Sequence, residues 1–257
     1  MLFRSGGFLS GRTKLGLGSS AAVTVAAVAS VFHEAGRSLQ NPEDRRELWR
    51  LCHRIHNEFQ KNTGSGADLA ASIFGGRVVF RPGSEGSPPA MTPHPPFPTL
   101  PWTAVWSGSP ARTPKLVDAV RRFRARESQV YHTRMEHLRG IAEGLIAADP
   151  ADTARCLDLL DAYGEGMEEL GRASGVPILT QTILSIRTLA RRHGGTAKPS
   201  GAGGGDLVLA FFPGEEQQTA FRNACTRKGY HLPDLHIAEQ GVRVSSDGTE
   251  GRKEKKP

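Results

Sequence analysis

The sequence predicts an α+β protein of two domains, and three observations lead to this class. Segments with helical hydrophobic periodicity alternate with a few short apolar runs that are typical of buried strands. A proline-rich stretch at residues 82–101 separates two groups of these segments. A chain of 257 residues is also long enough for one large or two small domains with a sizeable core.

Composition narrows the class of function. The formal net charge is +7 at pH 7 and the pI is about 9.7, which fits anionic phosphorylated ligands but equally a solvated surface or non-specific affinity for nucleic acid. Basic residues are not interleaved with aromatic ones, so we expect no nucleic-acid partner. We expect no membrane segment and no signal peptide, because no apolar run is long enough for either. Three widely spaced cysteines fit reduced thiols, and we expect a cytoplasmic protein.

The first domain is expected over residues 1–100. A run of small apolar residues at 21–29 predicts a buried helix. Asn41, as N-cap, and Pro42, at the first helical position, predict the start of a second helix with an apolar stripe. Residues 77–81 are predicted as a strand, and the proline-rich stretch after them as a linker.

The second domain is expected over residues 101–244, followed by a disordered basic tail at 245–257. Apolar periodicity and turn residues define its elements. The expected elements are a strand at 102–107, helices beginning at Thr113 and spanning 132–148, 150–172 and 177–192, a strand at 206–212, a helix at 215–228 and a strand pair at 231–244.

A glycine-rich loop, Lys14-Leu15-Gly16-Leu17-Gly18-Ser19-Ser20-Ala21-Ala22, is the first candidate for chemistry. Its glycines let the backbone approach a ligand, and the N-terminus of the following helix attracts anions through free N–H groups and the helix dipole. A serine hydroxyl in this position can ligate Mg²⁺. The pattern departs from the common nucleotide-binding glycine motifs, since Ala21 stands where a third glycine would be. The residues alone fit either a phosphate site or a tight turn before a core helix.

Two further glycine clusters carry candidate site residues. Gly64-Ser65-Gly66-Ala67-Asp68 places a carboxylate at a helix start, where it is either an N-cap or a group that accepts or orients a substrate proton. Lys198-Pro199-Ser200-Gly201-Ala202-Gly203-Gly204-Gly205-Asp206 leads directly into a predicted strand. It is interpreted either as a flexible linker or as a rigid turn whose backbone closely approaches another group. The histidines on helical patterns have no metal-ligand companions and are predicted to be structural.

The three clusters together resemble the motifs of the GHMP kinases, a family of small-molecule kinases. Residues 16–22 resemble the family's phosphate loop, and 198–206 are similar to its third motif in the form found in the phosphomevalonate kinase branch. Residues 64–68 are similar to the substrate-side segment of the mevalonate and phosphomevalonate branch. Trp106-Ser107-Gly108-Ser109-Pro110-Ala111-Arg112-Thr113 also resembles the start of the C-terminal domain. The resemblance covers about residues 12–212.

The resemblance implies a two-domain fold, with a partial ribosomal S5-like N-terminal domain and a ferredoxin-like C-terminal domain. It implies an ATP- and Mg²⁺-dependent phosphotransferase that converts 5-phosphomevalonate to 5-diphosphomevalonate in the mevalonate pathway of isoprenoid biosynthesis. The implied partner is a small phosphorylated substrate, and the protein is expected as a monomer or homodimer. Mevalonate kinase, another GHMP kinase and a non-catalytic binding homologue are the alternatives.

The resemblance also implies roles for individual residues. Asp68 is the expected catalytic base or orienting carboxylate, and Lys14 is expected to neutralise phosphate charge. The expected ATP-binding residues are Gly16, Leu17, Gly18, Ser19, Ser20 and Ala21, with Ser20 as the Mg²⁺ contact. The expected substrate-binding residues are Ser65, Gly66, Lys198, Ser200, Gly201, Ala202 and Gly203.

One departure from the family concerns its first motif, which contributes a lysine and early strands. The phosphate loop here begins at Gly16, and no such motif precedes it in this sequence. We therefore expect this chain by itself to be poorly active and to expose a sheet edge.

Overall fold

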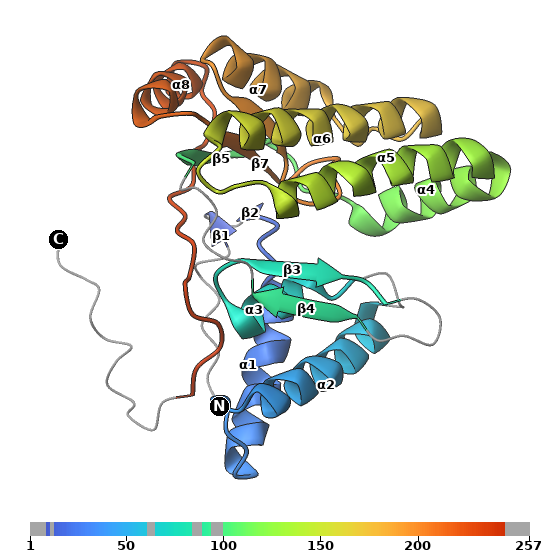
Figure 1. Cartoon of the computed structure of the whole chain (residues 1–257), viewed down its shortest axis with the longest axis vertical. Helices are drawn as coiled ribbons and strands as arrows, with labels where there is room; N and C mark the ends of the chain where they lie inside the picture. The colour runs from blue at the N-terminus through green and yellow to red at the C-terminus, as the bar shows by residue number, and fades with distance from the viewer. Residues whose placement is uncertain (1–8, 11–12, 61–64, 84–88, 94–99, 245–257) are drawn as a thin grey trace. The chain divides into compact units, whose positions relative to one another are not determined.

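The computed structural model describes residues 9–10, 13–60, 65–83, 89–93 and 100–244, and it mixes helices with antiparallel sheets (Figure 1). This confirms the α+β prediction. The chain divides into two compact units, unit 1 (1–4, 18–93 and 237–257) and unit 2 (5–17 and 94–236). The division differs from the predicted one at three places among the described residues. Residues 9–10, 13–17 and Leu100 group with unit 2, and residues 237–244 group with unit 1.

Unit 1 packs three helices and a β-hairpin around one apolar core (Figure 1). The Asn41-Pro42 pair begins the second helix as expected, and the Asn41 side chain accepts a hydrogen bond from the Glu43 N–H at 2.9 Å. Buried core residues come from all three helices, among them Val25, Leu48 and Leu69. The elements are α1 (Ser19–Glu34), α2 (Pro42–Gln60), α3 (Ala67–Phe74), β3 (Val78–Arg81) and β4 (Ala90–Pro93).

Strand β4 corrects the prediction that residues 82–101 form only a linker. It pairs antiparallel with β3, with Val79 opposite Thr92 and Phe80 opposite Met91. The apolar side chains of Phe80 and Met91 pack against the core of unit 1, and this burial favours the hairpin over an extended linker.

The last segment of unit 1 corrects a second prediction. Residues 231–244 contain no strand, although a strand pair was expected there. Instead, the Gly76 N–H donates to the Ala238 carbonyl at 2.7 Å, and the Val242 N–H donates to the Ser72 carbonyl at 2.9 Å. A Cβ atom at Gly75 would lie 2.1 Å from the Gly241 nitrogen, so the segment lies directly against the end of α3.

Unit 2 consists of a three-stranded antiparallel sheet with helices, and a short hairpin (Figure 1). The sheet order is β5-β7-β6, with Ala104 opposite Leu209 and Ala197 opposite Ala210. Strand β6 was not predicted, so the third glycine cluster begins inside a strand. The elements are β1 (Leu9–Ser10), β2 (Thr13–Lys14), β5 (Trp102–Trp106), α4 (Thr113–Arg126), α5 (Ser128–Ala147), α6 (Thr153–Ser174), α7 (Gln181–Arg192), β6 (Thr196–Pro199), β7 (Leu207–Phe211) and α8 (Glu215–Arg227).

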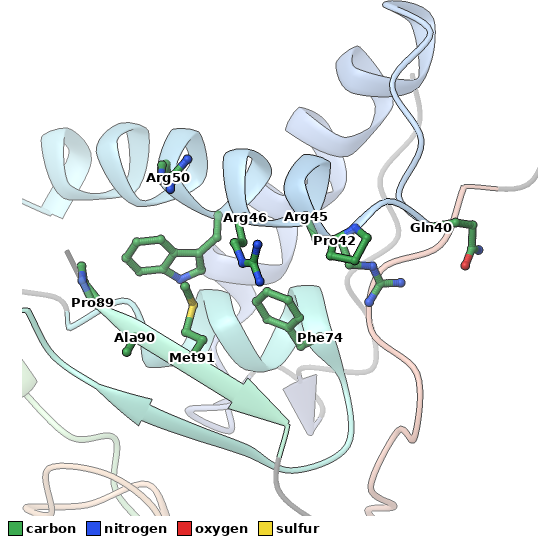
Figure 2. Close-up of a pocket in the computed structure, with 10 residues that line it drawn as sticks. Gln40, Pro42, Arg45, Arg46, Arg50, Phe74, Pro89, Ala90 and Met91 are labelled. Carbon is green, nitrogen blue, oxygen red and sulfur yellow. The ribbon is translucent and has the colours of Figure 1, made fainter.

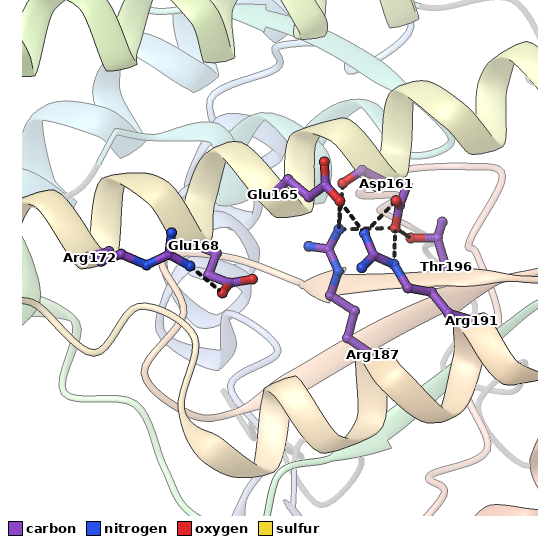
Figure 3. Close-up of polar contacts among 7 residues, drawn as sticks. All are labelled: Asp161, Glu165, Glu168, Arg172, Arg187, Arg191 and Thr196. Atoms are coloured by element: carbon purple, nitrogen blue, oxygen red, sulfur yellow. Dashed lines mark hydrogen bonds and ion pairs between the residues drawn. The ribbon is translucent and has the colours of Figure 1, made fainter.

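An ion-pair cluster around the buried Arg187 joins α6, α7 and β6 (Figure 3). The Arg187 guanidinium, whose residue is only 2 % exposed, donates to the carboxylate of Asp161 at 3.0 Å and to its backbone carbonyl at 2.7 Å. Arg191 donates to both oxygens of the same carboxylate, and the Thr196 hydroxyl donates to it at 2.5 Å. Although burial raises the pKa of Asp161, the hydrogen bonds from Arg191 and Thr196 hold it below its ordinary value.

No helix among the described residues is both long and apolar enough to cross a bilayer.

Candidate active site

The N-terminus of α1, in unit 1, has no side-chain cap. Gly18 precedes the helix in the left-handed conformation, with φ at +69°, and no side chain caps the helix there. The first turn carries no acidic residue. Ser19 is half-buried and Ser20 is exposed, whereas Ala21 is buried. This end therefore fits a phosphate group, and the hydroxyl of Ser20 fits a hard cation such as Mg²⁺.

Asp68 lies beside this helix end. A Cβ atom at Gly18 would lie 3.5 Å from the Asp68 Cβ, and Asp68 is exposed. The interpretation of Asp68 as an N-cap is wrong, because Gly66 takes that position and Asp68 lies in the first turn of α3. One carboxylate oxygen accepts the Leu69 N–H at 3.0 Å. Unit 1 thus places an accessible carboxylate next to an uncapped helix N-terminus.

The loop before Asp68 is held by two aromatic rings of α2. The Trp49 indole N–H donates to the Gly66 carbonyl at 3.3 Å. His53 stacks on Trp49, with ring centroids 4.6 Å apart and an interplanar angle of 17°. The sequence interpretation missed both residues, since Trp49 was assigned only to an apolar stripe and His53 only to a structural role. Their spacing of four residues, which places both on one helix face, is the signal that was available.

Within unit 2, Gly16 lies against Asp206. The Gly16 φ is +73°, and a Cβ atom there would come within 2.4 Å of the Asp206 carboxyl carbon. Asp206 itself has a φ of +56°, the only positive value among the described non-glycine residues. Its carboxylate accepts the Ala111 N–H at 3.0 Å, and its N–H donates to the Ser109 carbonyl at 2.8 Å. Asp206, another residue not predicted for the site, thus anchors the start of the glycine-rich loop at Gly16.

We expect Gly16→Ala to destabilise the protein, because alanine must adopt an unfavourable φ and displace the Asp206 carboxylate. The expected loss in the free energy of unfolding is about 1–3 kcal/mol, measured by urea denaturation. Gly140→Ala is the matched control, since a Cβ atom at Gly140 on α5 meets nothing within 4 Å. Equal stability of the two variants would contradict the clamp between Gly16 and Asp206.

The third glycine cluster is a rigid turn, and the linker interpretation is wrong. A Cβ atom at Gly203 would lie 2.3 Å from the Ile178 carbonyl oxygen, and the Gly204 N–H donates to that oxygen at 2.8 Å. The group that the Gly203 backbone closely approaches is therefore the backbone of Ile178. Ser200, Gly201 and Ala202 form the exposed tip of the turn, and a Cβ atom at Gly201 meets nothing within 4 Å.

The Lys198 ammonium group is buried, whereas a lysine that binds phosphate is expected to be accessible. Its ammonium donates to the Pro199 carbonyl at 3.0 Å and lies 5.6 Å from the centre of the Tyr163 ring. Burial lowers the pKa of Lys198 to about 8. Lys14 lies in β2, and its side chain is outside the described part of the chain.

The lowered pKa of Lys198 predicts a pH-dependent stability. Between about pH 8 and its ordinary pKa of 10.5, the unfolded chain binds the proton that the folded chain has lost, so this residue makes stability rise with pH. Lys198→Met removes that rise. Burial raises the pKa of Cys52 to about 12, and this residue makes stability fall as the pH rises. The quantity to compare is therefore the free energy of unfolding of Lys198→Met minus that of wild type at each pH. Urea denaturation from pH 7 to 10 measures it, and a constant difference would contradict the prediction.

Unit 1 also contains a pocket of about 550 Å³ along α2 (Figure 2). Its lining combines three arginines of α2 with apolar side chains of α3 and β4. None of the predicted site residues lines it. The lining residues are Gln40, Pro42, Arg45, Arg46, Trp49, Arg50, Phe74, Pro89, Ala90 and Met91.

Curated relatives of this chain are kinases of mevalonate and phosphomevalonate. A phosphomevalonate kinase from Streptomyces sp. is 32% identical over 224 residues, which are 79% of this chain and 58% of that protein. A mevalonate kinase from Thermococcus gammatolerans is 29% identical over 234 residues, 89% of this chain and 65% of that protein. The chain thus spans about three fifths of the length of these relatives.

A solved structure supports the fold. The Streptococcus pneumoniae phosphomevalonate kinase, in complex with phosphomevalonate and AMPPNP, superposes with a TM-score of 0.76 at 18% identity, covering 90% of this chain and 72% of that one. Models of the GHMP kinase N-terminal domain and of the GHMP kinase C-terminal region match residues 12–76 and 154–231. The first matched range contains the glycine-rich loop and Asp68. The second contains α7, β6, β7 and α8, and all of α6 except its first residue. The chain belongs to the GHMP kinase family.

Proposed function

We propose that this chain transfers the terminal phosphoryl group of ATP to 5-phosphomevalonate. The observation that carries the proposal is the accessible carboxylate of Asp68 beside the uncapped N-terminus of α1. The Streptomyces relative, at 32% identity, supports phosphomevalonate as the acceptor. The net charge of +7 agrees with two anionic substrates.

Phosphoryl transfer asks little covalent chemistry of the protein, so positioning and charge stabilisation are the tasks of these residues. The N–H groups that follow Gly18 hold phosphate oxygens, and the Ser20 hydroxyl holds Mg²⁺, which neutralises phosphate charge when bound. Asp68 orients the attacking oxygen of the acceptor and accepts its proton where one is present. In unit 2, we assign Ser200 and Ala202, at the exposed tip of the glycine turn, to contacts with substrate phosphate.

Mevalonate is the second candidate acceptor, and two observations favour it. Mevalonate kinases are among the relatives of this chain, and the one from Thermococcus gammatolerans matches 89% of it. An alcohol must also lose a proton during transfer, which gives a carboxylate such as Asp68 a task as general base. A phosphate monoester has a second pKa near 6 and is already largely deprotonated at pH 7.

Acceptor preference tests the proposal more sharply than absolute rate. ADP release is measured with ATP and equal concentrations of phosphomevalonate, mevalonate or galactose. The highest kcat/KM is expected with phosphomevalonate, and a higher value with mevalonate would replace it as the substrate. ATP binding without ADP release on any acceptor would instead identify a binding homologue.

A further inference from the structure

We propose that His53, stacked on Trp49, is a positioning residue that sets the direction of the Asp68 carboxylate. The inference rests on the proposed function, because it assigns a task at the same site. Four contacts within unit 1 carry it.

The first two contacts fix the backbone before Asp68. The Trp49 indole donates to the Gly66 carbonyl at 3.3 Å. Gly66 has a φ of +83°, and a Cβ atom there would lie 2.5 Å from the His53 Cδ2 and 3.1 Å from the Trp49 Cζ2. The two stacked rings therefore press on the Gly66 backbone so closely that only glycine fits.

The third contact links this backbone to the direction of Asp68. Gly66 is the N-cap of α3, and its carbonyl also accepts the Ala70 N–H at 3.0 Å. Asp68 follows two residues later in the first helical turn. Because the helix geometry is rigid from the cap onward, a shift of Gly66 moves the carboxylate with it.

The fourth contact holds the His53 ring itself. The Asn57 side-chain amide lies 3.1 Å from the His53 Nε2. Burial and the neighbouring His56 lower the pKa of His53, while Asp68 and a hydrogen bond to the Ser65 backbone raise it. The net effect is a pKa of His53 below its ordinary value, because burial outweighs the opposing contribution of Asp68.

A merely structural role for His53 predicts lower stability with an unchanged rate per folded molecule. A positioning role predicts that kcat falls while the KM for ATP is kept, because the phosphate-binding N–H groups belong to α1 and not to the Gly66 loop. Displacing a reacting group by about 1 Å costs up to about 100-fold in rate. The two roles are therefore separable by measurement.

The kinetic test uses four variants of the full chain. His53→Ala removes the stack and is expected to lower kcat about 10–100-fold with the KM for ATP changed less than about twofold. His53→Phe restores the stack without ring nitrogens and is expected to recover part of the rate. Trp49→Phe removes only the indole donor. His33→Ala, at an exposed position in the last turn of α1, is the control and is expected to behave as wild type. Unchanged kcat in folded His53→Ala overturns the proposal.

A second measurement does not depend on turnover. The pKa of His53 is followed by NMR in wild type and in Asp68→Asn, and the amide resonances of residues 65–69 are compared in His53→Ala and His33→Ala. We expect Asp68→Asn to lower the pKa of His53, and His53→Ala alone to shift the loop amides. An unchanged pKa, or equal amide shifts in both variants, overturns the positioning role even if the chain is inactive. Absence of ADP release with both NMR effects present counts against the proposed function alone.

Discussion

Asp68→Asn is expected to lower the rate of ADP release with mevalonate by about 10²–10⁴-fold, which is the contribution expected of a general base. With phosphomevalonate the loss is smaller, because the attacking phosphate oxygen is already largely deprotonated at pH 7. The substitution preserves size, and Asp68 is exposed, so the fold is expected to survive. Steady-state kinetics with both acceptors measures the two losses.

The control for Asp68 is Asp118→Asn on α4, an exposed carboxylate of unit 2 whose ion pair with Arg121 spans one helical turn. It is expected to leave both rates unchanged. Equal losses with the two acceptors would show that Asp68 only orients the acceptor. No loss with either acceptor would contradict its place in the site.

Asp161→Ala produces the largest expected loss of stability, about 3 kcal/mol in the free energy of unfolding. The substitution leaves the guanidinium of Arg187, with a side chain only 3% exposed, without its closest carboxylate. The guanidinium is tightly enclosed, because a Cβ atom at Gly164 would lie 2.2 Å from the Arg187 Nη1. Urea denaturation measures the loss.

Two controls separate this buried cluster from ordinary surface pairs. Glu136→Ala breaks an ion pair with Arg139 on the surface of α5 and is expected to leave the free energy of unfolding nearly unchanged. Adding Arg187→Met to Asp161→Ala is expected to restore part of the loss, because the uncompensated charge is then gone. A double variant as unstable as Asp161→Ala would contradict the explanation.

The lowered pKa of Asp161 gives this prediction a pH signature. A carboxyl whose pKa is lower in the folded state stabilises the protein fully above its ordinary pKa of 3.8. That stabilisation disappears as the pH falls through the lower folded value. The difference between wild type and Asp161→Ala should therefore narrow in acid.

Local chemistry made much of the fold predictable. Pro42 after Asn41 marked the start of α2, and the apolar run at 207–211 marked a buried strand, because caps and burial act within a few residues. Strand β4 and strand β6 were missed because their stability comes from pairing with distant strands. The many prolines around Ala90 predicted a linker at the place where β4 lies.

The same distinction applies to the site. The glycine loop and Asp68 were visible because their residue types are unusual in those places. Their proximity through Gly18 follows from the packing of α1 against α3, which no local pattern contains. Asp206 was missed as an anchor because its partners, Gly16 and Ala111, are distant in sequence. His53 was missed because its role depends on the shape of the Gly66 turn.

Residues 237–244 form hydrogen bonds to Ser72 and Gly76, at and just after the end of α3, and this affects the order in which the two units fold during synthesis. Unit 1 begins at Gly18 in its main segment, but it lacks the hydrogen bonds at Gly76 and Ser72 until Ala238 and Val242 have been synthesised. Unit 2 has all of its residues once His236 has been added. On the ribosome, the unit whose main segment is translated first is therefore the last to complete its contacts.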